Sequence, residues 1–275
     1  MNPWLETLCV ILVALLGVLL GWAFSRLRQP YWISGYLISL LLIAVLVTAR
    51  FANPSLCTSF FDWLTATRAK FVLLSLAATI GITTPFSRLP HKFEKLAVSI
   101  LLAIVVTWFS VLPFLVPALI KDYLSNLKTR IDPEGNCFQS TNYTCGPAAA
   151  VTALGKLGIQ AQEGQIAILA HTSPIAGTLP QCLSSALNNR YGPAGLKCQY
   201  RHFDSISQLK DAEITLAVVK DRLLSNHCVA VLKVSDHSVL IADPVFGNIS
   251  MSHKQFEKMW LFAGIVLKRD SFQNI

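Results

Sequence analysis

The hydrophobic and polar positions divide the chain at about Lys121. Before this residue, long apolar runs alternate with short charged segments, and after it polar, charged and apolar residues mix in globular proportions. Apolar runs of about 20 residues match the thickness of the hydrocarbon core of a bilayer. The sequence therefore predicts a membrane region over residues 1–120, a polar connector over 121–131 and a separate domain over 132–275.

Four runs in the first region are expected to be transmembrane helices: Leu5–Phe24, Tyr31–Ala49, Phe71–Phe86 and Leu96–Ile120. The positive charge of the first run follows it, at Arg26 and Arg28, which favours an uncleaved helix over a signal peptide. Pro113 and Pro117 are expected to kink the last turns of the fourth helix. The run Asn53–Thr67 is too weakly apolar to cross, and we expect it to lie at the membrane interface.

The domain after the connector changes from helical to strand periodicity along its length. Helical spacing continues through Gln165–Ala170 and Leu179–Asn189. Short runs rich in β-branched residues then predict strands at Lys197–Arg201, Thr215–Val219, His227–Val234, Ser238–Ala242 and Gly264–Leu267, with one short helix at Gln255–Trp260. This order predicts an α+β fold with N-terminal helices and an antiparallel sheet.

The composition supports a membrane protein and argues against nucleic acid as a partner. Hydrophobic residues make up 53% of the 275 residues and charged residues only 14%, whereas roughly a quarter are charged in soluble proteins. The alternative, that the apolar runs are buried helices of a large soluble protein, does not explain why charged residues flank each run. The net charge of +8 comes from dispersed basic residues, several of them beside apolar runs, where they anchor helix ends at lipid headgroups.

Cys145 is the candidate nucleophile. It precedes Gly146-Pro147 and an alanine-rich helical run, and proline is tolerated only in the first turn of a helix. The free N–H groups and the positive dipole end of a helix favour a thiolate at that position. Gln139, six residues upstream, offers an amide of the kind that stabilises an oxyanion. The alternative is a cysteine that fills a core, but a core cysteine requires neither the Gly-Pro start nor the polar approach.

His227 and Asp243 are the candidate partners of the cysteine. A thiolate enzyme needs an imidazole to move a proton and a third group to orient the imidazole. Of the six histidines, His227 alone opens an apolar strand, and Asp243 ends the next strand before Pro244. Without Cys145, these two residues would read as an exposed strand-start histidine and an Asp-Pro turn.

These residues together resemble the bacteriocin-processing cysteine peptidases. The shared features, in order, are Gln139, Cys145-Gly146-Pro147-Ala148, Gly158, Gly177-Thr178-Leu179, His227, and Asp243-Pro244 with Gly247. The resemblance implies a papain-like domain that cleaves leader peptides after Gly-Gly. It also implies that Cys145 is the nucleophile, His227 the base, Asp243 the orienting acid and Gln139 the oxyanion donor, and that the protein lies in a bacterial cell membrane.

The chain also departs from that family. Family members commonly precede an exporter with an ATPase, but this domain follows four apolar runs and no Gly-x-x-x-x-Gly-Lys-Ser/Thr loop occurs. We therefore expect a stand-alone form that acts on a peptide or protein, with the bilayer and a separate exporter as partners. Thr144 replaces a usual acidic residue, and Cys228 a usual aromatic one. Two alternatives remain open: a catalytically silent module that binds leader peptides, and an accessory protein of a transporter.

Neither a cofactor nor a metal is expected, because the cysteines show no Cys-x-x-Cys spacing. An even number of spans places both ends of the membrane region on one side. The positive charge of Arg26 and Arg28 after the first helix favours an extracytoplasmic location for both ends, and so for the domain that follows. There Cys137, Cys182, Cys198 and Cys228 could form two disulfides, whereas leader peptides met in the cytoplasm would favour reduced thiols.

Overall fold

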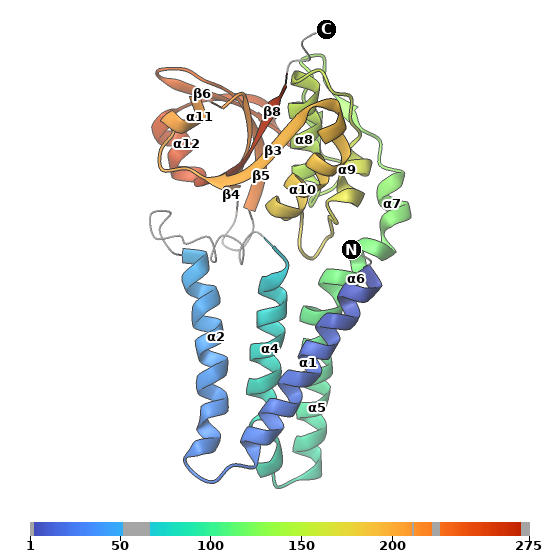
Figure 1. Ribbon diagram of the computed structural model, residues 1–275, viewed down its shortest axis with the longest axis vertical. Coiled ribbons are helices and arrows are strands. Elements are labelled where there is room, and N and C mark those ends of the chain that lie inside the picture. Colours follow the sequence, from blue (N-terminus) through green and yellow to red (C-terminus); the bar gives the residue numbers. More distant parts are fainter. Residues whose placement is uncertain (1–2, 52–66, 211, 222–225, 271–275) are drawn as a thin grey trace. The chain divides into compact units, whose positions relative to one another are not determined.

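The computed structural model of the chain describes residues 3–51, 67–210, 212–221 and 226–270 (Figure 1). The chain divides into two compact units, Met1–Leu119 and Ile120–Ile275. The run that we expected at the membrane interface, Asn53–Thr67, lies almost wholly outside the described residues.

Helices alone make up the described part of the first unit. Its elements are α1 (Pro3–Ser25), η1 (Tyr31–Ile33), α2 (Ser34–Phe51), α4 (Ala69–Thr83), η3 (Phe86–Arg88), α5 (Lys92–Val106), η4 (Thr107–Val111) and α6 (Leu112–Leu119). Among the described residues, four helical segments are long and apolar enough to cross a membrane: Trp4–Ser25, Tyr31–Ala49, Ala69–Arg88 and Lys92–Leu119. The four long apolar helices are thus present as predicted.

Small residues allow α1 and α4 to approach closely. A Cβ atom at Gly17 would overlap the hydroxyl of Thr79, and one at Gly21 would overlap the hydroxyl of Thr83. The hydroxyls of Thr79 and Thr83 are buried and donate to carbonyls of their own helix, at 2.8 and 2.6 Å. Close packing of a glycine against a threonine whose hydroxyl bonds its own helix is a contact typical of helices that associate in lipid.

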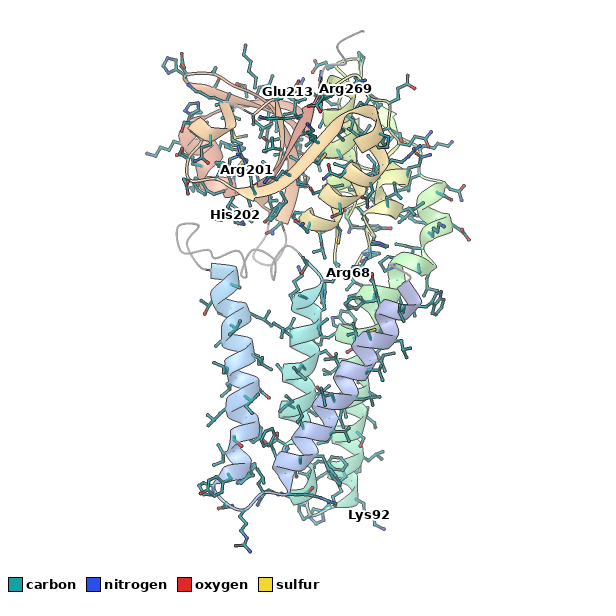
Figure 2. The ribbon with its side chains drawn as sticks, viewed as in Figure 1. Arg68, Lys92, Arg201, His202, Glu213 and Arg269 are labelled. Carbon is teal, nitrogen blue, oxygen red and sulfur yellow. The ribbon has the colours of Figure 1, made fainter. Side chains whose placement is uncertain are left out.

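Charged groups occupy the two ends of this helical unit. Arg68 lies at one end and Lys92 at the other (Figure 2). Arg68 donates to the carboxylate of Glu6 at 2.7 Å, and both side chains are largely buried. Lys92 is exposed, as are Arg26 and Arg28 in the turn after α1.

The fourth helix departs from α-geometry earlier than the prolines predict. The segment η4 is a turn of π-helix, and the N–H of Leu112 closes it by bonding the Thr107 carbonyl. Pro113 follows directly and has no N–H to continue the regular bonding pattern, which explains why the irregularity precedes it. Pro117 lies within α6 without ending it.

The second unit begins with helices and ends with a sheet. Its elements are α7 (Lys121–Ser125), β1 (Arg130–Ile131), β2 (Cys137–Phe138), α8 (Cys145–Lys156), α9 (Glu163–Leu169), α10 (Pro180–Tyr191), η5 (Gly192–Ala194), β3 (Leu196–His202), α11 (Ser207–Lys210), β4 (Ile214–Lys220), β5 (Asn226–Val234), β6 (Ser238–Asp243), β7 (Gly247–Ser252), α12 (His253–Met259) and β8 (Trp260–Arg269). The predicted α+β order is confirmed. The polar edge strand β7 and the short elements α7 and α11 were not predicted.

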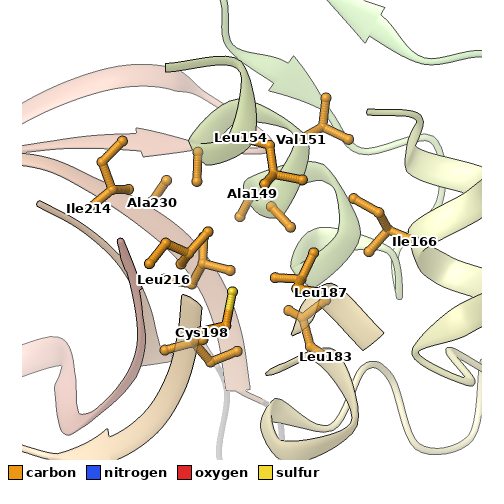
Figure 3. Close-up of a cluster of buried hydrophobic side chains, with 14 of the residues drawn as sticks. Ala149, Val151, Leu154, Ile166, Leu183, Leu187, Cys198, Ile214, Leu216 and Ala230 are labelled. Carbon is orange, nitrogen blue, oxygen red and sulfur yellow. The ribbon is translucent and has the colours of Figure 1, made fainter. Parts of the chain in front are cut away.

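Six strands form one antiparallel sheet in the order β3-β8-β4-β5-β6-β7. Because side chains alternate along a strand, the sheet carries a core on each face. One core packs α8 and α10 against residues such as Leu216 and Ala230 (Figure 3). The other lies under α11 and α12 and includes Phe256 and Trp260, whose rings are 5.4 Å apart. The strands that will carry the site are therefore packed on both sides.

Candidate active site

Cys145 is the first residue of α8, and the residues around it explain why the helix begins there. Thr144, the preceding residue, has non-helical backbone angles and Pro147 lies in the first turn. A Cβ atom at Gly146 would lie 3.0 Å from Cβ of Thr178, so a larger residue there would push the loop before α10 away by a few tenths of an ångström. At its other end, α8 stops at Gly158, whose φ of +71° favours glycine. The thiol is thus held at the N-terminal end of a buried helix.

His227 and Asp243 lie at the same end of two adjacent strands. The register that pairs Ala230 of β5 with Ala242 of β6 brings the start of β5 beside the end of β6. The imidazole Nε2 of His227 lies 3.1 Å from Oδ1 of Asp243. The same Oδ1 accepts the backbone N–H of Val245 at 2.7 Å, which fixes the carboxylate. Asp243 is only 6% exposed, so water competes little for these bonds.

The charges of this pair are set by burial and by hydrogen bonds. Burial by itself lowers the pKa of His227, but hydrogen bonds with Asp243 and with Cys145 outweigh it and raise that pKa from 6.5 to about 10. Burial raises the pKa of Asp243, whereas the bonds from His227 and Val245 lower it more, so the net pKa is below 3.8. At neutral pH the pair is an imidazolium and a carboxylate. A protonated imidazole beside Cys145 is the partner that a thiolate requires.

Gln139 lies between two anchors. Its N–H donates to the carbonyl of Pro244 at 2.9 Å, and its carbonyl accepts from Nη2 of Arg130 at 3.1 Å. The first bond joins Gln139 to the turn that follows Asp243. The side-chain Oε1 is buried without a hydrogen-bond partner among the described residues. The structure thus brings Cys145, His227 and Asp243 together and fixes the backbone of Gln139 to the same turn.

Several residues around the site were not found from the sequence. Glu163 of α9 bonds Ser140, the residue after Gln139, with both carboxylate oxygens. The carbonyl of Pro244 could not be predicted either, because a backbone acceptor leaves no pattern in the sequence.

Of the other histidines, His202 lies 3.4 Å from the Tyr200 hydroxyl and His253 bonds the Ser235 carbonyl. Neither forms a described hydrogen bond with Cys145.

The two departures from the family pattern have structural explanations. Thr144 accepts the N–H of Thr141 at 3.1 Å and so closes the turn before Cys145. The thiol of Cys228 packs against the core under α8, and its burial, together with the nearby Cys145, raises its pKa well above 9.0. No disulfide joins any of the cysteines in the described part of the chain, so the two bridges considered for an oxidising compartment are not formed.

Comparison with known proteins identifies the second unit. Residues 136–271 match the Peptidase C39 family. An uncharacterized protein of Methanothermobacter marburgensis is 28% identical over 53% of this chain and 96% of its own length, and one of Methanothermobacter thermautotrophicus is 27% identical over 51% and 92%. The resemblance to the bacteriocin-processing peptidases is confirmed by this family match.

Two solved structures resemble about half of the chain. One is a double glycine motif protease from an AMS/PCAT transporter in complex with its leader peptide, 16% identical over 52% of this chain and 93% of that chain, with a TM-score of 0.41. The other is the peptidase domain of Streptococcus ComA, a bi-functional ABC transporter, 21% identical over 48% and 96%, also with a TM-score of 0.41.

Proposed function

Residues 136–271 belong to the Peptidase C39 family, and from that membership we propose that the protein is a membrane-anchored cysteine peptidase with a Cys145, His227 and Asp243 triad. The single observation that carries the proposal is the contact of 3.1 Å between Nε2 of His227 and Oδ1 of Asp243, with Cys145 near enough to raise the pKa of the same imidazole. A nucleophile, a base and an orienting acid are the minimum set for acyl transfer through a thioester.

The mechanism follows from the charge states of these groups. The Cys145 thiolate attacks the scissile carbonyl, and the amide of Gln139 donates to the oxyanion that forms. The imidazolium of His227 gives its proton to the leaving amine, which leaves a thioester on Cys145. Neutral His227 then takes a proton from water, and the hydroxide attacks the thioester, releasing the acid and the thiolate. Asp243 holds the ring in one tautomer throughout.

The substrate class is a peptide or protein, and the motif resemblance favours a leader that ends in Gly-Gly. Neither glycine before the cleaved bond carries a side chain, so side-chain recognition of such a leader must use the residues that precede the two glycines.

The decisive experiment compares the cysteines of the intact, detergent-solubilised protein. Iodoacetamide at about pH 6 should alkylate Cys145 first, because only a thiolate reacts quickly there. Cys198 is the internal control, because its burial raises its pKa to about 12. In parallel, a synthetic leader peptide with a Gly-Gly junction should be cleaved by the wild type and not by Cys145→Ala.

Two outcomes separate the candidate functions, and a third tests the assignment of the base. Cleavage that depends on Cys145 supports the peptidase. A leader that binds to the wild type without cleavage, with Cys145 no more reactive than Cys198, would instead identify a catalytically silent binding module. Normal cleavage by His227→Ala would mean that another histidine is the base.

We further propose that the four apolar helices span a cell membrane and that the peptidase domain lies on the extracytoplasmic side. Arg26 and Arg28 are exposed in the turn after α1, and Lys92 is exposed at the start of α5. At the opposite helix ends Arg68 pairs with Glu6, Lys70 lies at the start of α4 and Lys121 follows α6. Basic residues thus lie at both ends of the helices, and it is the charge step directly after the first helix, at Arg26 and Arg28, that favours a cytoplasmic location of the turns. A substrate made in the cytoplasm would need a separate exporter as partner.

A matched pair of reporter cysteines tests this topology. Ser207 and Ser87 are both exposed, one in α11 and one in the turn between α4 and α5. In a chain with Cys9→Ser, an impermeant maleimide should label Ser207→Cys in intact cells and Ser87→Cys only after lysis. The reverse pattern would place the domain in the cytoplasm, and equal labelling of both would refute the spanning arrangement.

A further inference from the structure

The loop from Gln139 to Thr144 carries both the oxyanion amide and the approach to the nucleophile. The distance between these two groups decides whether the amide reaches the oxygen of an attacked carbonyl, and an error of about 1 Å can cost about 100-fold in rate. Precise positioning of the amide therefore requires interactions that hold the backbone of this loop in place. The residues that bond its backbone point to Glu163.

Glu163 holds the loop with both oxygens of its carboxylate. Oε1 accepts the N–H of Ser140 at 2.8 Å, and Oε2 accepts the hydroxyl of Ser140 at 2.6 Å. The residue is 0% exposed, and in the described part of the chain no lysine, arginine or histidine forms an ion pair with it. Burying a carboxylate without a counter-ion is costly. The two hydrogen bonds from Ser140 offset part of that cost.

The position of Ser140 connects this clamp to the oxyanion donor. Ser140 follows Gln139 directly, and Gln139 is bonded on its other side to the carbonyl of Pro244, next to Asp243. The backbone that carries the amide is therefore fixed between the carboxylate of Glu163 and the strand end that carries the acid. Release of either anchor lets the amide move relative to Cys145.

The clamp itself is supported by residues that precede the family match at residue 136. The N–H of Glu163 donates to the hydroxyl of Thr129 at 3.0 Å, and the Ser140 hydroxyl lies 3.2 Å from the carbonyl of Lys128. A Cβ atom at Gly164 would overlap the carbonyl of Leu124, so only glycine lets α9 pack against the end of α7 at this distance. The segment 124–130 thus contributes to the site, although it lies outside the matched domain.

We propose that Glu163, supported by Thr129, is a positioning residue that sets the oxyanion amide of Gln139 through Ser140. This inference rests on the proposed peptidase function. A purely structural role for Glu163 would affect all reactions of Cys145 alike, whereas a positioning role affects only those that pass through an oxyanion.

Two reagents separate these roles in the full-length protein. The ester p-nitrophenyl acetate acylates a thiolate through a tetrahedral oxyanion, releasing p-nitrophenolate, whereas iodoacetamide alkylates it by direct displacement of iodide. Mass spectrometry of the Cys145 peptide gives both rates. Glu163→Gln should slow acylation about 10-fold and leave alkylation unchanged, and Gln139→Ala should slow acylation about 100-fold. Adding Glu163→Gln to Gln139→Ala should change acylation by less than about 2-fold, because residues that act as one unit are not additive.

The controls keep each outcome decisive. Ser140→Ala removes one of the two bonds with little risk to the fold and should show a smaller loss of the same kind. Glu213→Gln changes an exposed carboxylate that accepts from Arg269 and should match the wild type. Equal loss of acylation and alkylation in both Glu163→Gln and Ser140→Ala, or additive losses in the double variant, would overturn the inference. A wild-type Cys145 that reacts with neither reagent faster than Cys198 would overturn the proposed function as well.

Discussion

Asp243→Asn is the perturbation that tests the charge state of the triad most directly. Asparagine keeps the shape of the side chain and an oxygen that can accept the N–H of Val245, but it removes the negative charge that faces His227. The expected consequence is a fall in the pKa of His227, because the hydrogen bond with this carboxylate is the largest single contribution that raises that pKa.

The size of the fall follows from the balance at His227. Burial lowers its pKa, so Asp243 and Cys145 together supply at least the whole rise from 6.5 to about 10. At about 1.4 kcal/mol per pKa unit, that rise corresponds to about 5 kcal/mol. The hydrogen bond with Asp243 is the largest single contribution that raises this pKa, so we expect Asp243→Asn to lower the pKa of His227 by about 2 units, or about 3 kcal/mol.

The assay is an NMR titration of isotopically labelled histidine rings in detergent, between about pH 5 and pH 11. The His227 signal is assigned by its absence from His227→Gln. Asp236→Asn is the control, because Asp236 is an exposed aspartate that pairs with Lys210. A midpoint for Asp243→Asn within about half a unit of the wild-type value would refute the reasoning.

Three further predictions concern stability. Gly21→Ala should lower the thermal midpoint of the helical unit, at a cost of about 1–3 kcal/mol, because the new Cβ would overlap Thr83. Gly81→Ala in the same unit, whose new Cβ would lie 3.3 Å from the hydroxyl of Ser39, should cost less. Ser252→Ala should remove about 1 kcal/mol from the second unit by breaking the capping box with Gln255, without altering the alkylation rate of Cys145. The pKa of His227 is raised in the folded protein, so protonation of its imidazole stabilises the wild type relative to His227→Gln. This difference in the free energy of unfolding should be complete below about pH 6.5, decline as the pH rises and vanish by about pH 10. Thermal melts of both proteins across this pH range measure it.

Much of the fold follows from local patterns. The spacing of apolar residues predicted the long helices and most strands, and the glycine at 158 predicted where α8 ends. The nearness of His227 and Asp243 also follows from the sequence, because consecutive strands joined by a short connection usually pair. Their register depends on an irregularity between Val231 and Lys233, which carries no pattern of its own.

The support of the site could not be predicted in this way. Glu163 and Ser140 are 23 residues apart and meet only after α8 and α9 have packed. In sequence, Glu163 reads as an acidic residue in the first turn of a helix, which usually faces solvent. Its burial is decided by the segment around Leu124, which looks like a polar connector. The ion pair of Glu6 and Arg68 could not be predicted for the same reason, because the two residues are 62 positions apart in the sequence.

The threonines of α4 have a consequence for the order in which the membrane region is assembled. Thr79, Thr83 and Thr84 donate to the carbonyls of Ser75, Thr79 and Ile80, one turn back in the same helix. The hydroxyls of these three threonines are therefore satisfied before any neighbouring helix is present, which removes most of the cost of placing them in hydrocarbon. In the proposed membrane arrangement, α4 can leave the insertion machinery as a single helix. Its docking onto the glycines of α1 can then follow inside the bilayer, as a separate step of biogenesis.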